Sequence, residues 1–231
     1  MVNAGMRPKI LDHVALWVAD RDPITDFVTE RLTMHVIEKT DKFTLVGTNA
    51  RRGKLTLFDA EGPRERGALK HIALRVNDLD EALGGLDGVD VARENGGAYF
   101  DVHEGLRLGL VEAETEVDYD LDHVALFSAS PEDTAQRYKE FGFAPEAETR
   151  VEVGGAFVEF HPGEPGDPER PLLNHLAVLV DSADETLEDA KQAGMEVADV
   201  VDAANTLAVF VWGPERVKIE YVEQKPTFAL K

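Results

Sequence analysis

Leu11-Asp-His-Val-Ala-Leu-Trp-Val18 is the first of four closely similar segments in the chain. The others are Leu69-Lys-His-Ile-Ala-Leu-Arg-Val76, Leu121-Asp-His-Val-Ala-Leu-Phe-Ser128 and Leu173-Asn-His-Leu-Ala-Val-Leu-Val180. Each reads leucine, polar residue, histidine, aliphatic residue, alanine, aliphatic residue. The histidines, which are His13, His71, His123 and His175, lie 58, 52 and 52 residues apart. This regular spacing indicates a fourfold internal repeat.

Each repeat predicts the same order of elements. The segments themselves have the β-branched and aliphatic composition of short strands. Acid-rich stretches that favour the start of a helix follow three of them, at 20–27, 77–83 and 181–190. The third segment is followed by Ser130-Pro-Glu-Asp, which predicts an N-cap with proline at the first helical position, and then by apolar residues at helical spacing over 135–141. Further strand-like runs come next, at 43–46, 54–58, 156–160, 207–211 and 217–222. The predicted unit is strand, helix and about three strands, in an α+β fold.

Two stretches divide the chain. The acid-rich stretch 112–120 has few core-forming residues, and we interpret it as the linker between an N-terminal half, residues 1–115, and a C-terminal half, residues 116–231. The stretch 162–171 is rich in proline and glycine, which predicts an exposed loop between the third and fourth repeats.

The composition excludes several classes of protein. The 231 residues include 24 Lys plus Arg and 45 Asp plus Glu, a net charge of −21, which disfavours nucleic-acid and membrane-surface partners. The absence of cysteine excludes disulfides, thiol catalysis, iron–sulfur clusters and Cys-rich zinc sites. No apolar run is long enough to span a membrane, and the N-terminus lacks an apolar signal core. We therefore expect a soluble, cytoplasmic protein.

The histidines are candidate metal ligands, although a histidine in an apolar strand is more often a buried, hydrogen-bonded ring. Aligning the two halves matches Glu159 with Leu57 and Glu220 with Gly109. Only the C-terminal half therefore has both histidines and both glutamates, and two imidazoles with a carboxylate favour a divalent metal. The alternative for Glu220 is a solvated strand face, and for Glu159 a salt bridge. On this interpretation the N-terminal histidines are structural remnants.

The four repeats, the histidine strands and the terminal glutamate resemble the vicinal oxygen chelate superfamily, which includes glyoxalase I, bleomycin-resistance proteins and type I extradiol dioxygenases. The resemblance covers residues 10–223 and implies four βαβββ modules, paired so that each pair curls its sheet around a cavity. Four modules with metal in the C-terminal pair are most similar to the extradiol, catechol 2,3-dioxygenase-type enzymes. That resemblance implies His123, His175 and Glu220 as metal ligands.

The chain departs from the extradiol pattern at two positions. Phe210 stands where that family has tyrosine, and no histidine lies between 200 and 206. His161 precedes His175 by 14 residues, about where the extradiol enzymes place an acid–base histidine, so it is the candidate catalytic residue; the alternative is a loop residue. Glyoxalase I uses two histidines and two glutamates, and its pattern implies Glu159 as a fourth ligand.

Three functions follow from the resemblance. The first is an extradiol-type oxygenase using Fe(II), or Mn(II), on a catechol-type substrate, and the second a glyoxalase-like lyase or isomerase using Zn(II) or Ni(II) on a dicarbonyl-type substrate. The third is a ligand-sequestering protein without catalysis, which retention of the ligands disfavours. The expected partner in each case is a small molecule, and a homo-oligomer would be compatible with all three functions. The candidates for an aromatic cavity lining are Phe127, Phe157, Phe210 and Trp212.

Overall fold

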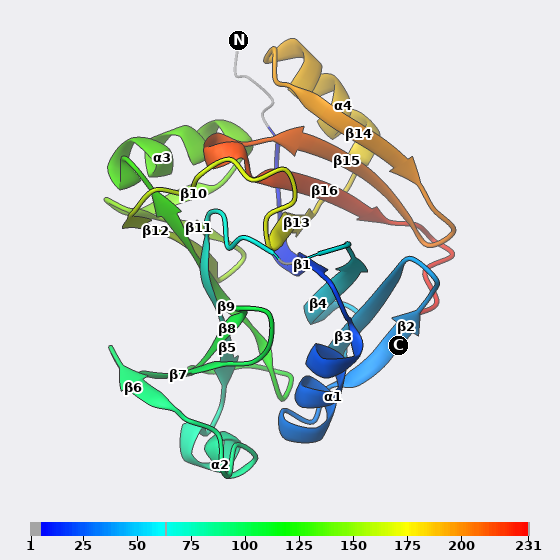
Figure 1. Cartoon of the computed structure of the whole chain (residues 1–231). Coiled ribbons are helices and arrows are strands. Elements are labelled where there is room, and N and C mark those ends of the chain that lie inside the picture. The colour runs from blue at the N-terminus through cyan, green and yellow to red at the C-terminus, as the bar shows by residue number, and fades with distance from the viewer. Residues whose placement is uncertain (1–5, 63, 231) are drawn as a thin grey trace.

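The computed structural model describes residues 6–62 and 64–230 and confirms the four modules (Figure 1). The first contains β1 (Ile10–Val18), α1 (Asp22–Arg31), β2 (His35–Lys39), β3 (Phe43–Asn49) and β4 (Arg52–Asp59). The second contains β5 (Leu69–Val76), α2 (Leu79–Gly84), β6 (Ala92–Glu94), β7 (Gly97–Asp101) and β8 (Arg107–Glu112). The third contains β9 (Asp120–Ser128), α3 (Pro131–Tyr138), β10 (Ala144–Ala147), β11 (Arg150–Val153) and β12 (Ala156–Pro162). The fourth contains β13 (Leu173–Leu179), α4 (Ala183–Gln192), β14 (Val197–Asp202), β15 (Thr206–Trp212) and β16 (Lys218–Gln224).

Each helix begins within two residues of its predicted start. Side-chain N-caps explain where α2 and α4 begin. The Asp78 side chain accepts a hydrogen bond from the backbone N–H of Glu81, and Ser182 does the same for Glu185. The predicted cap at Ser130 makes no side-chain hydrogen bond, so α3 begins on its first-turn proline alone and ends in a short 3-10 helix, Lys139–Phe141. None of the described helices is long and apolar enough to cross a lipid bilayer.

The strands form two eight-stranded sheets that join modules out of chain order. The first sheet has the order β14-β15-β16-β13-β1-β4-β3-β2, and the second has the order β10-β11-β12-β9-β5-β8-β7-β6. The first module thus shares a sheet with the fourth, and the second with the third. The expected grouping into residues 1–115 and 116–231 is therefore not the grouping of the sheets. The segments expected to link the modules are found between strands, with 113–119 joining β8 to β9.

Each sheet is centred on two antiparallel histidine strands. β1 pairs with β13 so that Ala15 lies opposite His175, and β5 pairs with β9 so that Ala73 lies opposite His123. Since all four histidine strands carry the same alternation of residues, either grouping of modules would bury the same faces. The sequence pattern that predicts each module therefore does not determine which two modules share a sheet.

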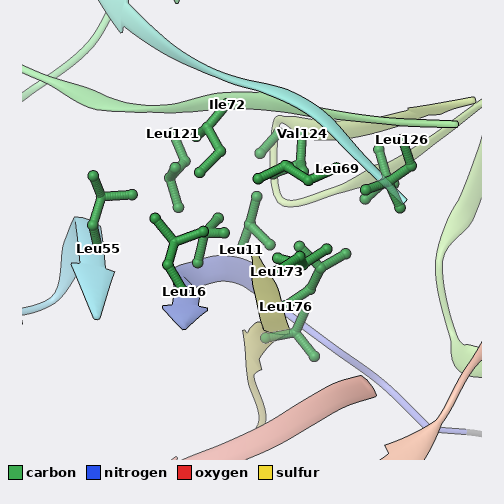
Figure 2. Packing of buried hydrophobic residues seen from close by; sticks show 14 of the residues in the cluster. Leu11, Leu16, Leu55, Leu69, Ile72, Leu121, Val124, Leu126, Leu173 and Leu176 are labelled. Atoms are coloured by element: carbon green, nitrogen blue, oxygen red, sulfur yellow. The ribbon is translucent and has the colours of Figure 1, made fainter. Parts of the chain in front are cut away.

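The hydrophobic core lies where the centres of the two sheets pack together. Along β1, Val14 and Leu16 are fully buried on the face opposite His13, as strand alternation requires. Figure 2 shows Leu16 and other side chains of the first sheet meeting side chains of the second, including Val124. Each fully buried aliphatic side chain contributes roughly 1.5–3 kcal/mol of transfer free energy. This core stabilises the fold independently of any ligand in the sheets' outer concavities.

Gly53 holds the contact between β4 and the strand that follows the central linker. Its φ is +67°, and a Cβ at this position would lie 2.3 Å from the backbone oxygen of Tyr119. Gly53→Ala should therefore lower the free energy of unfolding by about 2–4 kcal/mol, combining left-handed strain with a backbone clash. Gly88→Ala is the matched control, since Gly88 has φ +81° but a Cβ added there would meet no heavy atom within 4 Å. Urea unfolding of both variants measures the difference, and equal losses would contradict the clash.

Candidate metal centre

Three side chains of the first sheet converge on its concave face: His13 from β1, His175 from β13 and Glu220 from β16. The two Nε2 atoms lie 3.2 Å apart. The Oε2 atom of Glu220 lies 3.1 Å from His13 Nε2 and 2.9 Å from His175 Nε2. All three side chains are nearly inaccessible to solvent, with exposed fractions of 13%, 4% and 9%. They form the one His/Asp/Glu group of metal-binding geometry found among the described residues.

Neighbouring side chains fix the orientation of both imidazoles. His13 Nδ1 donates to Asp12 Oδ1 at 2.8 Å, and the Nζ of buried Lys54 lies 2.8 Å from the same oxygen. His175 Nδ1 donates to Asn174 Oδ1 at 3.2 Å. Because these oxygens accept the Nδ1 protons, each imidazole in its neutral form presents an Nε2 lone pair toward Glu220. Partners of this kind orient the histidine ligands of metal sites.

Three lone-pair acceptors this close repel one another unless a cation lies among them. The buried Oε2 of Glu220 makes no hydrogen bond among the described residues. Burial opposes ionisation of Glu220, but the two imidazoles hold the pKa of its carboxyl group well below the usual range. Burial would lower the pKa of His13, but Glu220 and Asp12 raise it to about 9, so a proton occupies the cluster when no metal does. This donor set fits a divalent ion, which would replace that proton.

The cluster lies in a cavity of about 740 Å³ with aromatic walls. The Phe210 ring packs edge-on to His175 with centroids 5.1 Å apart, and the Phe58 centroid lies 6.2 Å from the same imidazole. Trp17 packs against Phe58, and Trp212 lies on the strand that carries Phe210. Ligand pockets typically have volumes of roughly 300–1,000 Å³ and mostly apolar walls, so this cavity accommodates a small aromatic molecule beside the three ligands.

The strand ladders place threonine, not glutamate, at the fourth position of this cluster. Ala15 pairs with Thr56 in β1–β4, and Ala125 pairs with Glu159 in β9–β12. Glu159 thus corresponds to Thr56 and not to Leu57, because the halves are offset by one residue relative to the alignment of their glycines. The matching of Glu220 with Gly109 holds, since these residues pair with Ala177 and Ala73 at equivalent positions. The cluster therefore has two histidines and one carboxylate.

A second cluster occupies the equivalent place in the other sheet. His71 Nε2 lies 3.0 Å from His123 Nε2, and Glu159 Oε2 lies 4.0 Å from His123 Nε2 and 3.5 Å from His161 Nε2. Arg150 Nη1 donates to Glu159 Oε1 at 3.1 Å, so this carboxylate has the salt bridge that the sequence left as its alternative. The shorter His71–His123 contact is a hydrogen bond between two imidazoles.

The environment of the second cluster is more cationic than that of the first. Lys70 stands where β1 has Asp12, and its Nζ lies 3.1 Å from His161 Nδ1. Gly109 stands where β16 has Glu220, and the Tyr99 ring fills the space, 2.5 Å from a Cβ at Gly109. Burial, with His123 and Lys70 adding to it, lowers the pKa of His71 to about 3. A neutral His71 therefore donates to His123, and this hydrogen bond satisfies the pair without a metal.

The low pKa of His71 predicts a loss of stability in acid. The unfolded chain takes up a proton near pH 6.5 but the folded chain only near pH 3, so stability is full above pH 6.5 and falls as the pH drops toward 3. Between pH 7 and pH 5 the native protein should lose about 2 kcal/mol more than His71→Gln. Urea unfolding at both pH values measures this. His103→Gln, at an exposed histidine, is the control and should keep the native slope; a His71→Gln protein with that slope would contradict the prediction.

The structure brings together two of the four expected ligands, His175 and Glu220. The expected ligands His123 and Glu159, and the expected catalytic residue His161, lie in the second cluster instead, because the third module pairs with the second. Of the expected aromatic lining, Phe210 and Trp212 line the metal cavity, whereas Phe127 and Phe157 belong to the second sheet. The sequence predicted His13 to be a structural remnant. The sequence feature that could have identified it as a candidate ligand is Asp12, because His71 has a lysine at the preceding position.

Comparison with known proteins agrees with this architecture. The family model described as Glyoxalase/Bleomycin resistance protein/Dioxygenase superfamily matches residues 10–99 and 120–221. No curated protein matches the sequence significantly. Among solved structures, a putative dioxygenase from Bacillus subtilis is 17% identical, with 97% of this chain and 88% of that chain covered and a TM-score of 0.77. Glyoxalase I from Zea mays is 16% identical, with coverages of 93% and 92% and a TM-score of 0.73.

These structural likenesses concern the fold, whereas the family model covers most of the sequence in two separate stretches. Each stretch begins at a histidine strand and covers most of two modules, the first ending within β7 and the second within β16. The chain therefore belongs to the Glyoxalase/Bleomycin resistance protein/Dioxygenase superfamily.

Proposed function

We propose that the chain is a metal-dependent enzyme of the extradiol-dioxygenase type, with His13, His175 and Glu220 holding one divalent ion. The observation that carries this proposal is the convergence of two lone-pair imidazole nitrogens and one buried carboxylate oxygen within 3.2 Å of one another. Two histidines and one carboxylate on a single face are the ligand set of non-haem Fe(II) oxygenases. Bound there, such an ion would lower the pKa of a substrate's hydroxyl groups and leave positions open for two substrate oxygens and O₂.

The surrounding residues have separate roles in this proposal. Asp12, held by Lys54, keeps His13 in the tautomer that ligates through Nε2, and Asn174 does the same for His175. Phe58 and Phe210 flank the His175 ring and would hold an aromatic substrate against the ligands. No tyrosine lines the cavity among the described residues, so proton transfer would use groups other than the tyrosine of the extradiol pattern.

A glyoxalase-like reaction is the second candidate. It would require a fourth protein ligand, and Thr56 occupies the position at which Glu159 lies in the other sheet. A hydroxyl is a weaker ligand for a divalent ion than a carboxylate because it brings no negative charge. The three-ligand arrangement therefore favours the oxygenase, while a purely sequestering protein would have no need of the oriented ligand set.

Oxygen uptake tests the proposal. Protein loaded anaerobically with Fe(II) is mixed with a panel of substituted catechols, and oxygen consumption is followed together with the visible absorbance of ring-opened products. We expect one O₂ consumed per catechol cleaved and no turnover by His13→Ala. Isomerisation of a glutathione–methylglyoxal adduct by Zn(II)- or Ni(II)-loaded protein, without oxygen uptake, would favour the glyoxalase-like reaction instead.

A further inference from the structure

Lys218 lies directly beside the metal ligands. It precedes Glu220 by two residues on β16, so both side chains are on the same face of the strand. Lys218 pairs in register with His175 on β13 and with Trp212 on β15. Its Nζ lies 5.6 Å from the centroid of the Trp212 ring. Lys218 therefore lines the same cavity as His13, His175 and Glu220, next to an aromatic wall.

Within the part of the chain that the structure describes, Lys218 makes no close ion pair, although Asp199 and Glu220, which line the same cavity, attract its ammonium group from a greater distance. The Glu220 carboxylate is directed at the two imidazoles, and no carboxylate of residues 6–62 or 64–230 lies within 4 Å of Lys218 Nζ. Lys218 is half-buried, and it lines both the 740 Å³ cavity and an adjoining cavity of about 420 Å³. A half-buried ammonium group that has no close ion pair keeps its hydrogen-bond donors available to a bound anion.

The equivalent residue of the other sheet gives an internal comparison. Arg107 precedes Gly109 as Lys218 precedes Glu220, and Arg107 also lies over an aromatic ring, that of Tyr99, at 5.7 Å. Arg107, however, is paired with Glu94 at 3.3 Å and with Asp101 at 3.7 Å. The same strand position thus carries a cation with two close ion pairs in the second sheet and a cation without a close ion pair in the candidate metal cavity. A carboxylate of a bound ligand would supply the close ion pair that Lys218 lacks.

We propose that Lys218 binds an anionic substituent of the substrate, so that the substrate is an aromatic acid with two neighbouring oxygens on its ring. The proposal rests on the proposed function, because it places those oxygens at His13, His175 and Glu220. Two residues along a strand span roughly 6.6 Å, comparable to the separation between the hydroxyls of a catechol and a carboxylate across the ring. Trp17, Phe58 and Phe210 then contact the ring itself.

Binding of matched probes tests this inference. The zinc-loaded protein, in which no oxidation occurs, is titrated by calorimetry with 3,4-dihydroxyphenylacetate and with its uncharged analogue 4-ethylcatechol. Trp17 and Trp212 are the two tryptophans of the chain and both line the cavity, so quenching of their fluorescence reports its occupancy. The native protein should bind the acid at least about 10-fold more tightly, as expected for a hydrogen bond to a charged group.

Three variants locate the effect. Lys218→Met should abolish the preference for the acid and change the affinity for 4-ethylcatechol less than 2-fold, whereas Lys218→Arg should retain the preference. Arg107→Met removes one positive charge at the equivalent position of the other sheet and should also retain it, which excludes a general effect of net charge. A preference that survives in Lys218→Met, or equal binding of both catechols by the native protein, would overturn the inference and leave the proposed function intact.

A further binding experiment tests the role of Lys218 even if the proposed function is wrong. If zinc does not strengthen binding of either catechol, vicinal oxygens are not bound at the metal site. Phenylacetate, which has the acid but no vicinal oxygens, then decides the inference on the protein as purified. Binding of phenylacetate that Lys218→Met weakens at least 10-fold supports the lysine as the anchor for an aromatic acid, and no binding overturns it.

Discussion

His13→Ala should remove the bound divalent metal, whereas His123→Ala should leave it in place. In the proposed site His13 would supply one of three ligand atoms, and its loss would leave one imidazole and one carboxylate. His123 lies in the second sheet, hydrogen-bonded to His71. We expect the apparent dissociation constant for Zn(II) or Fe(II) to rise at least about 100-fold in His13→Ala, beyond the roughly 10–100-fold typical of losing a supporting residue.

Metal analysis after dialysis, together with competition against a chelating dye, measures this effect. The native protein and His123→Ala should each retain one metal per chain, and His13→Ala should retain little. Circular dichroism checks that both variants fold, which the buried core between the sheets leads us to expect. Metal loss in His123→Ala alone would show that the ligand comes from the third module and not the first, and equal loss in the two variants would contradict a site confined to the first sheet.

The sequence predicted each module but not the partner of each module. Every histidine strand repeats the same alternation, and this alternation determines which face is buried and where the histidine points. Pairing depends on which strands lie side by side at the centre of a sheet, and β1 offers the same backbone and side-chain pattern to β13 as to β5. The structure places His175 and Glu220 together in the candidate cluster, as the sequence predicted, because both belong to one module, whereas the third member of the cluster depended on the pairing.

Local chemistry distinguishes the histidines better than the repeat does. Asp12, Asp122 and Asn174 each accept a hydrogen bond from the Nδ1 of the following histidine, whereas Lys70 cannot. Such an acceptor frees Nε2 to bind a metal, so the residue before each histidine carries information about its role. By this criterion both His13 and His123 remain candidate metal ligands. Only the three-dimensional placement of Glu220 and Glu159 separates those two, since the first faces two oriented imidazoles and the second is paired with Arg150.

Glu220→Gln should weaken metal binding by at least about 100-fold while leaving the fold intact. Two neutral imidazoles bring no negative charge, so a divalent ion held by them alone keeps its full charge inside a largely apolar cavity. The carboxylate offsets half of that charge and supplies the third ligand atom. Glutamine keeps the shape and one oxygen but removes the charge, so the loss reports the electrostatic contribution of the carboxylate.

Glu159→Gln is the matched control, because it makes the same change in the second cluster. Its side chain is bonded to Arg150 and lies 4.0 Å from His123 Nε2, so the variant should bind metal as the native protein does. Competition titrations with Zn(II) give both affinities, and urea unfolding without metal gives both stabilities. Comparable losses of affinity would make Glu159 a ligand and favour the glyoxalase-like reaction. Native affinity in Glu220→Gln would mean that the metal binds elsewhere, since no other described carboxylate approaches His13 and His175 in this way.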